Sequence, residues 1–174
     1  MFRSLFFLLP VLCLQQLANC SPHNNKILST SHPGAGAIKI VNVNVERHAQ
    51  EDFVRIGEYF NGGRECGGRR CIVRDDGNVR AGLYFVINFN RPLKNLPSDL
   101  SLNIYTMIGN SHIPEKFEFA LPNRRKSFTA EIYCGITSGR IGDARINAWK
   151  VELVDNGSGK IISDCRNYMW PKNM

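Results

Sequence analysis

Hydrophobic and polar residues alternate along much of the chain with a period of two, which places successive side chains on opposite faces of a β-strand. The clearest case is residues 81–90, where every second residue is apolar: Ala81, Leu83, Phe85, Ile87 and Phe89. Six further segments share this signature and predict strands: residues 38–46, 100–107, 117–121, 127–134, 146–153 and 160–165. The pattern therefore predicts a chain built from about seven short strands.

The segments between these strands are rich in glycine, proline and asparagine, as turns and loops are. Residues 155–159 read Asp-Asn-Gly-Ser-Gly and predict the turn of a hairpin, whereas residues 47–80 read as loops and turns. No stretch keeps a helical period for more than two turns. We therefore expect an all-β fold, an immunoglobulin-like antiparallel β-sandwich of two sheets.

The N-terminus has the pattern of a secretory signal peptide. Arg3 precedes an apolar run of about ten residues, too short to span a bilayer, and small residues follow before Ser21. We expect residues 1–20 to be removed, residues 21–37 to form a flexible lead-in and residues 38–174 to form one domain. The sequence thus predicts a secreted, extracellular protein without a membrane span.

Four cysteines follow the signal peptide, namely Cys66, Cys71, Cys134 and Cys165. An even number in a secreted chain predicts two disulfides, with three pairings open. The spacing of Cys66 and Cys71 is half of a zinc site, but the other half is missing, so a local disulfide is favoured and no metal is expected. Asn156 opens an Asn-Gly-Ser glycosylation sequence in the predicted hairpin turn, as in a glycoprotein.

The formal charge of +7 is spread over the chain, which fits solubility or an anionic partner. No nucleic-acid motif is present. No nucleophile has a histidine base at a recognisable spacing, since His48 and His112 read as solvated loop residues. No carboxylate pair or phosphate loop is evident either. We therefore expect no catalytic residue and no cofactor. We expect a monomer that binds a partner rather than catalysing a reaction.

From Cys66 to Cys165 the order of features resembles the ML family of secreted lipid-recognition domains. The resemblance rests on the C-x4-C pair before the strand at 82–90, on residues 100–114, and on the closing segment 149–165 with its tryptophan and late cysteine. It implies a sandwich whose sheets hold a lipid, sterol or fatty acid between them without catalysis. The first strand lacks the family's early cysteine, which leaves Cys134 or Cys20 as the partner of Cys165.

A cavity between splayed sheets needs large apolar lining residues, although the same residues also suit a filled core. The candidates are Phe85, Ile87, Phe89, Leu102, Ile104, Phe117, Phe119, Ile132, Trp149 and Val151. A basic rim for an anionic head group would comprise Arg91, Lys94, Lys116, Arg124, Arg125 and Lys126. The alternative function is a secreted immune or chemosensory protein that binds a receptor or an anionic microbial surface through the basic loop 122–126.

Overall fold

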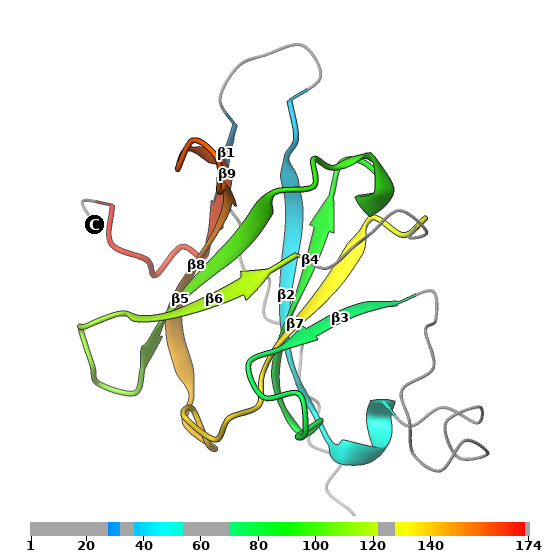
Figure 1. Cartoon of the computed structure of the whole chain (residues 1–174). Coiled ribbons are helices and arrows are strands. Elements are labelled where there is room, and N and C mark those ends of the chain that lie inside the picture. The colour runs from blue at the N-terminus through cyan, green and yellow to red at the C-terminus, as the bar shows by residue number, and fades with distance from the viewer. Residues whose placement is uncertain (1–27, 32–36, 54–69, 122–127, 173–174) are drawn as a thin grey trace, which may run out of the picture.

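The computed structural model describes residues 28–31, 37–53, 70–121 and 128–172, and this part of the chain forms two facing β-sheets (Figure 1). The five-stranded sheet has the order β1 (Leu28–Ser31), β9 (Ile161–Arg166), β8 (Ile146–Asp155), β5 (Leu100–Ile108) and β6 (Glu115–Ala120). The four-stranded sheet has the order β2 (Ile40–His48), β4 (Gly82–Phe89), β7 (Glu131–Ile136) and β3 (Cys71–Arg74). Two short 3-10 helices, η1 (Gln50–Phe53) and η2 (Leu93–Asn95), complete the described elements.

The predicted all-β sandwich is confirmed, and each of the seven predicted segments contains a strand. Two strands were not predicted, because four residues are too few to display a period of two. β1 lies within the predicted lead-in and pairs with β9, and β3 lies within the predicted loop 47–80. β3 runs parallel to β7, whereas the other pairings among the described strands are antiparallel. Residues 1–20, the predicted signal peptide, lie outside the described residues. Among the residues that the structure describes, no helix is long and apolar enough to cross a bilayer.

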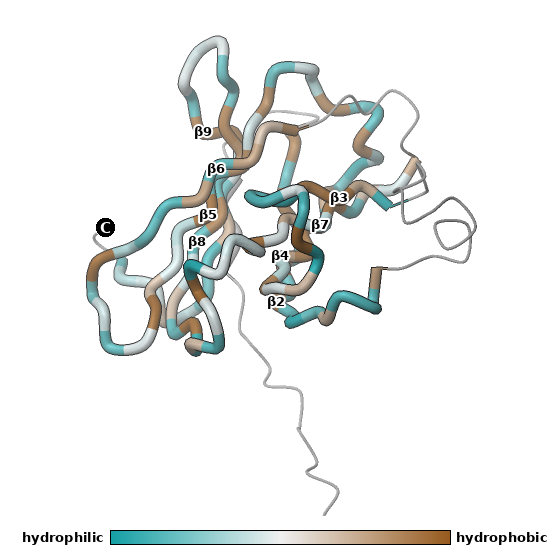
Figure 2. The backbone as a smooth tube through the Cα atoms, turned by 60° about the horizontal axis from the view of Figure 1, so that its bottom comes forward, coloured by the Kyte–Doolittle hydropathy of each residue, from teal (hydrophilic) through white to brown (hydrophobic). Residues whose placement is uncertain are grey.

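The core lies between the two sheets and is formed by apolar side chains from both of them. Figure 2 shows hydrophobic residues along strands of both sheets. Phe85 of β4 and Trp149 of β8 meet edge to face with ring centroids 6.1 Å apart, which joins the two sheets. Aromatic pairs in this geometry stabilise a core by about 1 kcal/mol beyond their buried area. The alternation read from the sequence therefore corresponds to the inward and outward faces of the sandwich.

The outer face of the four-stranded sheet is covered by an aromatic cluster that η1 completes. The Tyr84 ring is fully buried and lies 4.5 Å from the Phe53 ring and 5.3 Å from the His48 ring, centroid to centroid. The Tyr84 hydroxyl donates a hydrogen bond to the Arg80 carbonyl (2.6 Å) and accepts one from Arg74 Nε (2.7 Å). These contacts fix the ring over the sheet.

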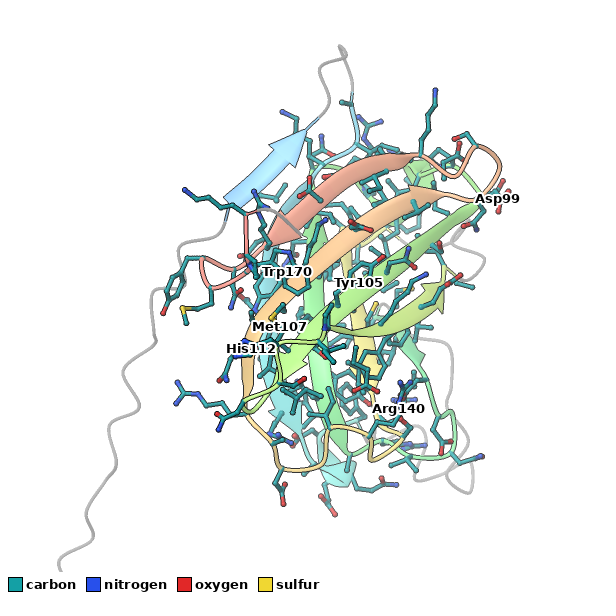
Figure 3. All side chains as sticks on the ribbon, turned by 90° about the vertical axis from the view of Figure 1, so that its left-hand side faces the viewer. Asp99, Tyr105, Met107, His112, Arg140 and Trp170 are labelled. Carbon is teal, nitrogen blue, oxygen red and sulfur yellow. The ribbon has the colours of Figure 1, made fainter. Side chains whose placement is uncertain are left out.

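The outer face of the five-stranded sheet is covered by the C-terminal segment (Figure 3). Trp170 packs on Met107 and Ala148, beside the ring of Tyr105. Asn167 holds this segment in place, because it donates from its backbone N–H to the Trp149 carbonyl (3.1 Å) and accepts from the Trp149 N–H through its side-chain oxygen (3.1 Å). The chain beyond β9 is therefore part of the fold.

A carboxylate ties β3 to the end of β7. Asp75 accepts hydrogen bonds from the backbone N–H groups of Thr137 (2.6 Å) and Ser138 (3.2 Å) and from both of their hydroxyls. Partial burial alone would raise the pKa of Asp75, but the hydrogen bonds from Ser138 and Thr137 outweigh it and hold the pKa below its ordinary value of 3.8. The ionised carboxylate thus fastens the end of edge strand β3 to the segment that follows β7.

The disulfide between Cys134 and Cys165, one of the pairings expected from the sequence, is not formed in the structure. The two thiols are free and buried on different sheets, Cys134 on β7 and Cys165 on β9. Burial raises the pKa of Cys134, with a contribution from Cys71, and burial and Asp164 raise the pKa of Cys165 to about 12. Cys66 and Cys20 lie outside the described residues, so the pairing predicted for Cys66 and Cys71 stays a prediction.

Candidate functional site

The candidate site lies where one edge of the sandwich opens between β2 and β8. At one end of this edge the sheets are linked by the Ile40 N–H, which donates to Ser163 Oγ of β9 (3.0 Å). At the other end, the lower one in Figure 1, Arg47 of β2 donates to the carbonyls of Gly142 (2.6 Å) and Ala144 (2.7 Å) in the loop before β8. β9 ends at Arg166, so the first residues of β8 face β2 without a strand between them.

A pocket of about 520 Å³, here named the edge pocket, fills this opening. Its apolar wall consists of side chains from three strands: Val45, Leu83, Ile146 and Trp149. Its polar and outer wall comes from β2, the loop and the C-terminal segment, with Arg47, Asp143, Arg145, Asn147, Asn167 and the exposed Tyr168 and Met169. A volume of this size lies in the range of small-molecule sites, and the lining combines an apolar wall with a polar one.

A second pocket of about 550 Å³, the loop pocket, lies on the other side of Arg47. It is bounded by the end of β2, the start of β4 and the 136–143 segment, and it includes His48, Asp52, Ile136 and Ile141. Arg47, Leu83 and Asp143 line both pockets. The Arg47 side chain and the loop that it holds therefore form the partition between the two spaces.

The charge of Arg47 is not neutralised by a carboxylate. Its hydrogen bonds to Gly142 and Ala144 end on neutral backbone carbonyls, and among the described residues it forms no ion pair. A guanidinium has five N–H donors in a rigid fork, so two carbonyl contacts orient the group and leave further donors available. Arg47 is thus a positioned cation on a pocket wall.

The ten predicted lining residues come together in one buried cluster between the sheets. Trp149 also lines the edge pocket, where it marks the boundary between the packed core and the opening. The other nine do not line the edge pocket. The structure therefore assembles the predicted set, and ligand binding by these residues stays a prediction.

The described residues of the predicted basic rim do not line these pockets. Arg91 and Lys94 follow the far end of β4, where Lys94 lies over the Phe128 ring (4.0 Å), and Lys116 pairs with Glu118 (3.0 Å) on β6. The loop with Arg124, Arg125 and Lys126 lies outside the described residues. The cations at the edge pocket are instead Arg47 and Arg145. Arg47 was missed because its charged stretch, residues 46–52, reads as solvated, although its place at the end of the first strand was a usable signal.

His48 is also placed differently from the expectation, whereas His112 is not. His48 is the last residue of β2, half-buried between Phe53 and Tyr84, with Nδ1 3.2 Å from Asp52 Oδ2. The prediction of a solvated loop histidine is wrong here, because η1 folds back over the strand. His112 is exposed between β5 and β6, as predicted.

Asn156, the predicted glycosylation residue, lies exposed in the turn between β8 and β9. Its Nδ2 donates to Asp99 Oδ1 (2.9 Å), and its Oδ1 accepts from Ser101 Oγ (2.8 Å). An amide nitrogen that carries a glycan keeps one N–H, so the contact with Asp99 is compatible with modification.

Comparison of the chain with protein-family models, curated proteins and solved structures finds no match to any of them.

Proposed function

We propose that the protein is a secreted, non-catalytic carrier that binds a lipid, sterol or fatty acid at the edge pocket and between its two sheets. The observation that carries the proposal is the edge pocket itself, an opening of about 520 Å³ that reaches Trp149 and Leu83 at the boundary of the core. A site with apolar side chains on one wall and charged groups on the other fits an amphipathic molecule. The resemblance to the ML family supports the same function.

Two further observations favour this function. The apolar residues between the sheets form one continuous cluster behind Trp149, so a ligand that displaces this side chain would meet only apolar surface. Asn156 is exposed in a turn, where a glycosylated secreted protein would carry its glycan. The basic loop of the alternative interaction function, residues 122–126, lies outside the described residues.

The test is binding of fluorescent sterol and fatty acid to the purified, delipidated chain. Val45 lines the edge pocket, and Val45→Trp should fill the opening and weaken binding at least tenfold. Val41→Trp is the matched control, since Val41 lies on the same strand but is 57% exposed and does not line the edge pocket. Both variants should keep the circular dichroism spectrum of the parent.

Two outcomes would count against the carrier function. One is that no lipid binds and none is extracted by organic solvent from the freshly purified protein. The other is that Val45→Trp and Val41→Trp bind every tested lipid with equal affinity, because the edge pocket would then not be the entry point.

A further inference from the structure

We propose that Arg47 binds the carboxylate head of a single-chain amphiphile in the edge pocket, so that the preferred ligand class is a fatty acid rather than a neutral sterol. This inference rests on the proposed function, because it assigns the head group of a ligand at the same site. It places the anion-binding group on β2, away from the basic residues expected from the sequence.

The first argument is the fixed position of the Arg47 guanidinium. Hydrogen bonds of 2.6 and 2.7 Å to the Gly142 and Ala144 carbonyls hold it in one orientation, so less conformational entropy is lost when an anion binds. A guanidinium fork that is already oriented matches the two oxygens of a carboxylate.

The second argument is the charge distribution around the edge pocket. The charged residues that line it are Arg47, Arg145 and Asp143, two cations and one anion. Among the described residues neither arginine forms an ion pair. On the loop-pocket side of the partition, Asp52 is already engaged by the Ala49 N–H (2.8 Å) and by His48. The unneutralised Arg47 therefore borders both pockets, and the edge pocket alone adds a second arginine, Arg145.

The third argument is the apolar wall next to Arg47. Val45 and Leu83 line the pocket beside the guanidinium, and Trp149 follows at the boundary of the core. A carboxylate on Arg47 would direct an attached hydrocarbon chain along this wall. A free small anion would gain only the exposed charge contact, which stabilises a complex weakly on its own.

The test is isothermal titration calorimetry of the full mature chain with four probes: laurate, lauryl alcohol, methyl laurate and acetate. We expect laurate to bind about three- to tenfold more tightly than the alcohol or the ester, and acetate to bind at least a hundredfold more weakly than laurate. In Arg47→Gln the preference for laurate over the alcohol should disappear, and Arg47→Lys should keep part of it. Arg166→Gln, which removes a cation that does not line the edge pocket, should leave the preference unchanged.

The selectivity separates a head-group role of Arg47 from a structural one. If Arg47 only held the loop, Arg47→Gln would weaken laurate and lauryl alcohol by the same factor, and that result would overturn the inference. Equal affinity of the parent for the acid, the alcohol and the ester would also overturn the inference. Binding of sterol but not of laurate would overturn it too. In both cases the carrier function would stand. If no lipid of any class binds, the proposed function fails and this inference fails with it.

Discussion

Gly135 lies directly beneath the ring of Tyr84, and the substitution Gly135→Ala should destabilise the protein more than its size suggests. The two residues are cross-strand partners on β7 and β4. A Cβ atom on residue 135 would lie 2.5 Å from Tyr84 Cε1 and 2.7 Å from Cζ, about 1 Å closer than a favourable carbon contact. Either the ring or the strand must move.

The ring has little freedom to move. Its hydroxyl is held between the Arg80 carbonyl and Arg74 Nε, and the rings of Phe53 and His48 pack against it. Overpacking of this kind costs about 1–3 kcal/mol, and the loss of one hydroxyl hydrogen bond adds about 1 kcal/mol. We therefore expect Gly135→Ala to lower the free energy of unfolding by about 2–4 kcal/mol, or the melting temperature by roughly 5–12 °C.

The assay is urea unfolding followed by tryptophan fluorescence, with Gly77→Ala as the control because a Cβ atom there meets nothing within 4 Å. The control should change stability by less than about 1 kcal/mol. Tyr84→Leu removes the ring atoms beneath which the new methyl group would lie, so Gly135→Ala should cost much less in that background. An effect of Gly135→Ala that matches Gly77→Ala, or that is the same in both backgrounds, would refute the reasoning.

Three further predictions concern Asp75, Trp170 and the thiols of Cys134 and Cys165. Because its pKa is lowered on folding, Asp75 should stabilise the protein above its ordinary pKa of 3.8 and cease to do so as the pH falls through the folded value. Asp75→Asn should thus lose less stability than the parent in urea titrations from about pH 6 to about pH 2; equal losses would refute this. Trp170→Ala should cost about 2–4 kcal/mol but Trp170→Phe much less, because the buried indole N–H has no partner among the described residues; equal melting temperatures would refute it. Cys134 and Cys165 should resist alkylation in the folded protein and become alkylated in urea without reductant, as mass spectrometry would show. A disulfide between them would leave both cysteines unmodified even in urea, and that result would refute the prediction.

The sequence predicts the parts of this fold that repeat over several residues. β4, β5 and β8 are eight to ten residues long and alternate cleanly, so their type, their inward faces and the hairpin between β8 and β9 could be read directly. β1 and β3 could not, because each has four residues and is a strand only through its pairing partner. Cross-strand pairing is a tertiary property that no local pattern contains.

The candidate site was predicted less well than the fold, for a physical reason. The residues of the edge pocket come from β2, β4, the loop before β8 and the C-terminal segment, which lie far apart in sequence. Trp149 was identified because a large apolar residue on a strand is expected to face inward. Arg47 was not, because its role depends on the carbonyls of a loop about 95 residues later in the chain.

Asn167 fixes the number of residues that must lie between β9 and Trp170. Its amide occupies the place of a strand residue opposite Trp149, and Trp170 is seated on the outer face only three positions later. Tyr168 and Met169, between these two anchors, stand at the rim of the edge pocket. An insertion or deletion of a single residue between Cys165 and Asn167 would misalign both anchors at once, so this short segment should tolerate exchanges of side chains far better than changes in length.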